Sequence, residues 1–139
     1  SIALHFDWVH TLDREKIAAR LARSRPPSLA PLKVLIQVNI SAESSKGGVA
    51  PNELPGLVEV ISALPQLQLC GLMALPAPHT DFDAQHASFS AVAALAADQS
   101  VPLTELSMGT TADYGAAIAA GSTMVRLGTK LFGPRPERP

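Results

Sequence analysis

The strongest constraint on the fold is a repeated alternation of short β-branched runs with alanine-rich segments of helical periodicity. The clearest strand is predicted at Lys33 to Ile40, where apolar side chains follow one another almost without interruption. Such a run is typical of a parallel strand covered on both faces. Strands that alternate with amphipathic helices indicate βα units around a parallel sheet. We therefore expect an α/β fold.

Five βα units can be distinguished along the chain. Besides the clearest strand, the pattern predicts strands at residues 8–12, 67–75, 103–106 and 123–127. It predicts helices at residues 14–23, 54–64, 80–96 and 112–120, with a short final turn between Gly128 and Gly133. The residues expected to cap the first three helices are Asp13, Asn52 and Thr80.

The length of one unit points to a larger closed fold. At about 28 residues per unit, eight units would need roughly 220 residues, close to a small (β/α)₈ barrel. The sequence therefore predicts a partial TIM barrel of about five units. An open doubly wound sheet is the alternative, and only the strand order separates the two.

Composition bounds the domain organisation and the partners. The 139 residues are 47% hydrophobic, enough for one domain, which we place at residues 1–133, followed by a flexible tail at 134–139. The formal net charge of −1 argues against nucleic acid or an anionic membrane as the main partner. No run of 18 apolar residues occurs, and the single Cys70 suits a reducing compartment. We expect a cytoplasmic protein.

The candidate binding residues follow the last two predicted strands. Ser107 to Thr111 combines hydroxyls with a glycine before a helix, whose free amide groups favour an anion. Arg126 to Thr129 adds a guanidinium, a second glycine and another hydroxyl. Either segment alone also reads as an ordinary helix cap or turn. Together they match the phosphate site that the last two βα loops of a barrel commonly build.

Two other groups of residues are weaker candidates for a functional site. Lys46 lies in the polar loop after the second strand and could act as a nucleophile, but a lysine beside two glycines is usually solvated. His79, Asp81, Asp83 and His86 are metal-ligand types, yet the aspartates equally suit the first turn of a helix. We predict no metal site and no catalytic residue.

Several segments resemble the pyridoxal-phosphate homeostasis proteins, whose barrel is similar to the N-terminal domain of alanine racemase. They are FDWVHTLD from Phe6 to Asp13, the loop from Asn39 to Gly48, the strand Gly71 to Met73, and AAIAAGSTMVRLGTKLFG from Ala116 to Gly133. The last is the most specific. The resemblance covers nearly the whole chain, but only about the last five of the family's eight units.

The resemblance implies pyridoxal 5'-phosphate as the cofactor, with an incomplete site. The family's cofactor lysine lies on its first strand, and by resemblance this chain begins after that strand. The positions that would surround the phosphate are Ser107, Gly109, Thr110, Thr111, Arg126, Gly128 and Thr129, with Met73 and Asn39 lining the pocket. Where the family usually has Met-Ser and a longer polar side chain, this chain has Thr110, Thr111 and Gly115.

Three functions stay open at this point. The first is a non-catalytic protein of pyridoxal-phosphate binding and homeostasis, of which this chain supplies the phosphate-binding half. The second is a fragment of a racemase-like enzyme, which would need further acid and base groups. The third is a truncated chain that functions only when its sheet edges pair with a missing N-terminal segment or with another copy.

Overall fold

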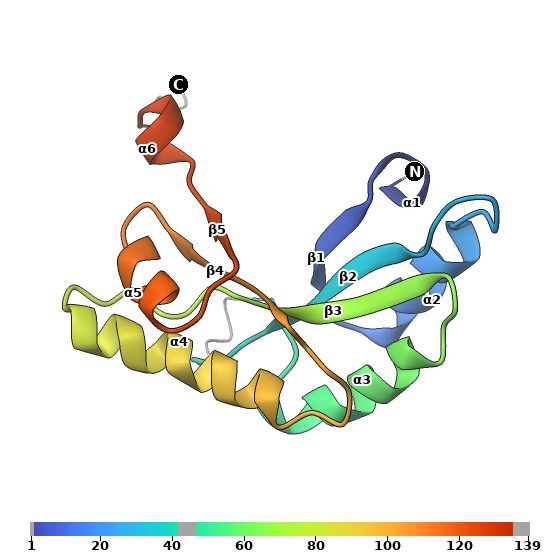
Figure 1. The fold of residues 1–139 in the computed structure, drawn as a ribbon, viewed down its shortest axis with the longest axis horizontal. Coiled ribbons are helices and arrows are strands. Elements are labelled where there is room, and N and C mark those ends of the chain that lie inside the picture. Colours follow the sequence, from blue (N-terminus) through green and yellow to red (C-terminus); the bar gives the residue numbers. More distant parts are fainter. Residues whose placement is uncertain (1, 42–46, 135–139) are drawn as a thin grey trace.

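The computed structural model describes residues 2–41 and 47–134, and it contains a single sheet of five parallel strands (Figure 1). The strands are β1 (Trp8–Leu12), β2 (Leu32–Val38), β3 (Leu67–Ala74), β4 (Glu105–Thr110) and β5 (Met124–Arg126). They lie in the sheet in chain order, β1-β2-β3-β4-β5. A doubly wound sheet requires a reversal of strand order, so that alternative is excluded. The fold is a partial TIM barrel, as predicted.

The helices are α1 (Ile2–His5), α2 (Glu15–Ser24), α3 (Leu54–Ser62), α4 (Phe82–Ala97), α5 (Tyr114–Ala119) and α6 (Thr129–Phe132), with a 3₁₀ turn η1 (Pro51–Glu53) before α3. Four helices, α2 to α5, connect successive strands, whereas α1 precedes β1 and α6 follows β5. Figure 1 shows α2, α3 and α4 beneath a curled sheet whose other face lies open between β1 and β5. We call these the outer and the inner face.

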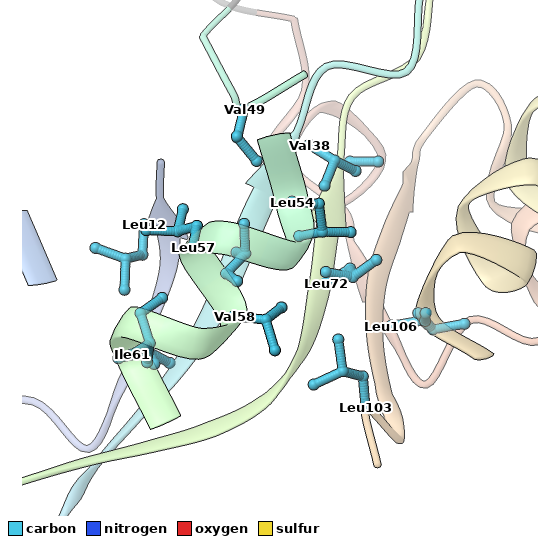
Figure 2. Packing of buried hydrophobic residues seen from close by; sticks show 14 of the residues in the cluster. Leu12, Val38, Val49, Leu54, Leu57, Val58, Ile61, Leu72, Leu103 and Leu106 are labelled. Atoms are coloured by element: carbon cyan, nitrogen blue, oxygen red, sulfur yellow. The ribbon is translucent and has the colours of Figure 1, made fainter. Parts of the chain in front are cut away.

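The outer face holds the hydrophobic core. In β2, Val34, Ile36 and Val38 belong to the core cluster, whereas Leu35 is buried outside that cluster, as the two-residue period of a strand requires. Figure 2 shows Leu54 of α3 beside Val38 and Leu72 of the sheet. Fully burying one such side chain contributes about 1.5–3 kcal/mol to folding. Packing of α3 on this face therefore contributes to the stability of the sheet.

The predicted caps were wrong at the ends of three helices. Asp13 does not cap α2: its carboxylate accepts a hydrogen bond from Arg14 Nε at 2.8 Å, and no side chain caps that helix. Asn52 lies in η1 instead of capping α3. Asp81 rather than Thr80 caps α4, where its Oδ1 accepts from the Ala84 amide at 2.9 Å. Of these three helices, only α4 therefore has a side-chain cap, since no side chain caps α2 or α3.

The fourth strand differs most from its prediction. The sequence placed it at residues 103–106, but β4 extends to Thr110. Its residues pair on both sides, Ser107 with Met73 of β3 and with Met124 of β5. Small and hydroxyl residues such as those at 107–110 are typical of loops, so the sequence pattern predicted a loop here. Backbone hydrogen bonds to the strands on both sides hold these residues in a strand instead. Most of the first candidate segment is therefore part of the sheet.

Some predictions fall on other parts of the chain. Lys46 and most of the predicted tail, residues 135–139, lie outside the described residues, so the division at residue 133 stays a prediction. Within the described ranges, α4 is the longest helix at 16 residues, and none is long and apolar enough to cross a membrane.

Candidate functional site

The two candidate segments meet at the carboxyl end of the sheet. β4 and β5 are parallel neighbours, and Thr110 is the register partner of Arg126. Both residues line a cavity of about 310 Å³, together with Gly109. The sequence prediction that these strand ends lie together is therefore confirmed.

Arg126 points across the inner face from β5 toward β4 and β3. Its Nη1 donates to the Ser107 carbonyl at 2.8 Å and to Ser107 Oγ at 2.7 Å, and its Nη2 donates to the Ala74 carbonyl at 3.0 Å. A guanidinium offers more N–H donors than these bonds use. Arg126 is thus fixed in place by three hydrogen bonds while keeping donors for a ligand.

The electrostatic surroundings of Arg126 favour an anion. Burial lowers the pKa of Arg126, and the charge of Asp113 acts in the opposite direction. Within the described ranges the ion pairs within 4.0 Å are Arg14 with Asp13 and Arg25 with Asp7. The acceptors that hold Arg126 are neutral, so a partly buried cation faces the cavity without a carboxylate in contact.

Ser107 links Arg126 to a residue from the far side of the sheet. The side chain is fully buried, and its Oγ lies 3.0 Å from His10 Nδ1. β2 and β3 separate β1 from β4 in the sheet, so this contact crosses the concave inner face. Burial, and to a lesser extent Arg126, lower the pKa of His10.

Thr110 is engaged within its own turn. Its amide and its hydroxyl both donate to Asp113 Oδ1, at 2.6 and 3.0 Å. An anion that used these donors would have to displace the Asp113 carboxylate. Thr110 is also not the N-cap that the alternative interpretation expected, because Asp113 holds the N-cap position of α5 and no side chain caps that helix.

Gly109 serves close packing between β4 and α5. Its φ of +97° lies in a region that side-chain-bearing residues rarely adopt, and an added Cβ would lie 2.6 Å from Ala117 Cβ. The sequence assigned this glycine to the approach of a ligand. The contact with α5 gives it a structural reason that does not involve a ligand.

The remaining candidates after the two strands lie at α6. Gly128 is the N-cap position of this short helix and Thr129 is its first residue. Thr111 Oγ1 accepts from the Lys130 amide at 3.2 Å. The turn after β4 is therefore tied to the turn after β5, although these three residues do not line the cavity.

Met73 and Asn39 lie at other strands. Met73 is buried, outside the core cluster, and pairs in register with Ser107. Asn39 follows β2, and its amide donates to the Val49 carbonyl at 2.9 Å. Neither lines the cavity beside Arg126.

Sequence reasoning missed several residues of the site. His10 was not among the predicted site residues, because nothing local reveals a contact 97 positions away. Asp113 carried a usable signal, since aspartate three residues after a threonine commonly bonds back to it. The far wall of the cavity includes His79, Gln85 and Phe89 from the α4 region.

The described residues include three lysines, of which Lys16 is exposed on α2. Lys33 Nζ lies 5.0 Å above the Trp8 ring, and Lys130 Nζ lies 2.6 Å from the Tyr114 hydroxyl. None of the three lines the cavity, so its wall offers donors for an anion and, over the described ranges, no lysine amine as a nucleophile. Those ranges also hold no group of three or more His, Cys, Asp or Glu side chains able to bind a metal ion.

Comparison with known proteins defines the class. The model of the alanine racemase N-terminal domain family matches residues 1–136. The chain belongs to this family.

Within the family, the resemblance to pyridoxal phosphate homeostasis proteins is confirmed. The protein of that name from Pseudomonas aeruginosa is 52% identical over 134 residues, covering 96% of this chain and 58% of the relative. Its counterpart from Vibrio cholerae is 53% identical over 137 residues, again with 58% of the relative covered. The chain thus spans less than two thirds of these relatives.

Solved structures agree with the fold. PipY of Synechococcus elongatus, in a structure with pyridoxal phosphate bound, superimposes with a TM-score of 0.86 at 33% identity, covering 95% of this chain and 63% of PipY. Alanine racemase from Bacillus anthracis superimposes with a TM-score of 0.66 at 17% identity, over 94% of this chain and 34% of the enzyme. The second likeness concerns the fold alone.

Proposed function

We propose that this chain binds pyridoxal 5'-phosphate as part of a homeostasis protein, without turnover, and that it supplies the phosphate-binding part of the barrel. The observation that carries the proposal is Arg126, a partly buried cation held by neutral acceptors at the edge of a cavity. The names of the relatives and the bound ligand of PipY point to the same cofactor.

The donors present fit a phosphorylated ligand. Arg126 supplies the charge, while the α6 start at Gly128 and Thr129 supplies amide groups that have no partner within so short a helix. Ser107 acts through Arg126, and Gly109 and Thr110 shape the cavity wall. Thr111, Met73 and Asn39 complete the proposed set from the surrounding strands and turns. When bound, the cofactor itself would supply the reactive aldehyde.

Equilibrium binding of pyridoxal 5'-phosphate to the 139-residue chain tests this proposal. We expect saturable binding that inorganic phosphate competes away. Arg126→Met should weaken binding by about tenfold or more, because hydrogen bonds to a charged group contribute about 1.5–3 kcal/mol. Arg23→Met is the matched control, since Arg23 is exposed on α2 and its loss changes the net charge equally.

Two outcomes would overturn the proposal. The first is an unmodified chain that shows no saturable binding. The second is equal affinity in Arg126→Met and Arg23→Met, which would reduce the effect to overall charge. Circular dichroism of each variant shows whether it is folded, so a loss of binding is assigned to the site and not to unfolding.

Absence of turnover has its own test. The same chain, saturated with pyridoxal 5'-phosphate, is incubated with L-alanine and assayed for D-alanine. We expect no racemisation above the rate of free cofactor, because the cavity wall presents no amine among the described residues. Racemisation that Arg126→Met abolishes would favour the enzyme instead.

Pairing through the sheet edges is a second candidate, supported by apolar residues beside β5. β1 and β5 each pair on one side only within the described sheet. Near β5, Ile118 is 55% exposed and Phe132 is 87% exposed. If the chain functions only when paired with another copy or a further segment, light scattering should find it associated. A compact soluble monomer that binds the cofactor would exclude this candidate.

A further inference from the structure

We propose that His10 is a positioning residue for the Arg126 site: its Nδ1 accepts the Ser107 hydroxyl proton and so orients Ser107 Oγ to receive Arg126. This inference rests on the proposed function, because it concerns how the same site is held ready for an anion. No motif of the sequence assigns His10 a role beyond its strand.

The three side chains form a continuous chain of polar contacts on the inner face. Arg126 Nη1 lies 2.7 Å from Ser107 Oγ, which in turn lies 3.0 Å from His10 Nδ1. They come from β5, β4 and β1, and the last two strands are not neighbours. The contact therefore spans the curl of the barrel.

The direction of the hydrogen bonds follows from the chemistry of the groups. A guanidinium only donates, so Ser107 Oγ is the acceptor toward Arg126. The hydroxyl proton of Ser107 must then find another acceptor, and full burial of Ser107 removes water as a partner. His10 Nδ1 is the acceptor in contact, which places the ring proton on Nε2.

The surrounding charges support a neutral ring. Burial lowers the pKa of His10, and the positive charge of Arg126 on β5 lowers it further. On β2, Lys33 lies over Trp8, and Trp8 itself packs edge-on against His10 at 5.9 Å.

The carboxylates on the neighbouring strands have other partners. On β4, Glu105 accepts from Thr123 at 2.8 Å. Asp13, after β1, is paired with Arg14. If His10 were protonated, the Ser107 hydroxyl would contact two cations, His10 and Arg126, which repel each other.

The tautomer of His10 can be measured without any ligand or variant. Nitrogen-15 NMR of the imidazole, at a pH well above the ordinary histidine value of 6.5, distinguishes a ring protonated on Nε2 from one protonated on Nδ1. We expect the Nε2–H form. A predominant Nδ1–H form would reverse the hydrogen bond and overturn the proposal.

A pair of substitutions then tests positioning. His10→Asn keeps an acceptor close to the position of Nδ1, whereas His10→Leu removes it. We expect His10→Leu to weaken binding of pyridoxal 5'-phosphate by about five- to tenfold, the value of one lost hydrogen bond, and His10→Asn to restore most of it. His5→Asn, at an exposed position on α1, is the control.

The outcomes separate this inference from the proposed function. If the unmodified chain binds no cofactor but His10 is the Nε2–H tautomer, the proposed function fails and the hydrogen-bond chain stands. If the chain binds and His10→Leu binds equally well, the positioning role is overturned. Equal weakening in His10→Asn and His10→Leu would likewise overturn it, because the acceptor would then not matter.

Discussion

The two faces of the sheet differ in what their side chains do. On the outer face, Leu72 and Ile36 pack against α3 and the neighbouring helices as part of one continuous apolar cluster. On the inner face, Ser107 and Arg126 form directed hydrogen bonds whose partners come from separate strands. The same alternation of residues along each strand serves both faces. The apolar core lies mainly on one side of the sheet, and the directed polar contacts of Arg126 and Ser107 lie on the other.

The largest effect should come from breaking the outer face. Leu54→Ala removes a fully buried side chain of α3 and should lower the free energy of unfolding by about 2–5 kcal/mol, through lost burial and the cavity left behind. Urea denaturation measures it. Leu131→Ala, at a position 68% exposed, should change stability by no more than about 0.5 kcal/mol. Similar values for both would contradict the contrast between faces.

The second largest loss of stability should come from the contact between β4 and α5. Gly109→Ala forces a side chain onto a φ of +97° and against Ala117, and we expect a loss of about 1–3 kcal/mol by the same denaturation measurement. A neutral result would show that α5 can move away from β4.

A second glycine in the same region should respond with the opposite sign. An added Cβ at Gly115 meets nothing within 4 Å, and the residue lies within α5. Gly115→Ala should therefore raise the free energy of unfolding by about 0.5–1 kcal/mol, because alanine loses less entropy in a helix. A destabilised Gly115→Ala would contradict the packing observed around α5.

The smallest effect should be a pH dependence confined to the inner face. Because the folded pKa of His10 is below 6.5, its neutral ring stabilises the fold fully above pH 6.5, and this contribution is lost as the pH falls through the lower folded value. Denaturation over this range in His10→Asn should show a shallower pH dependence. The Asp13 carboxyl, whose pKa is also lowered, acts below 3.8 and leaves this window undisturbed. An unchanged slope in His10→Asn would count against a titrating His10.

The sequence predicted the elements better than the contacts between them. Apolar periodicity indicated all five strands, since burial on a helix-covered face leaves a local pattern, whereas their order in the sheet came from the structure. The extent of β4 escaped it, because Ser107 and Gly109 resemble turn residues and only pairing on both sides makes them a strand.

The sequence predicted part of the candidate site, because neighbouring βα units place their strand ends side by side. Adjacent strand ends could be inferred from the order of the βα units, and Arg126 with Thr110 meets that expectation. His10 could not be found, because its contact with Ser107 depends on how strongly the sheet curls. The engagement of Thr110 by Asp113 depends on one turn conformation that residue types alone do not fix.

The unbroken strand order also bears on how the chain is made. Each strand pairs with the strand synthesised immediately before it, so a nascent chain can extend the sheet one βα unit at a time as it leaves the ribosome. Within the described sheet, each strand from β2 onward finds its first partner in the strand just before it. The hydrogen bond between His10 and Ser107 is different, because it joins β1 to a strand that is synthesised only after β2 and β3.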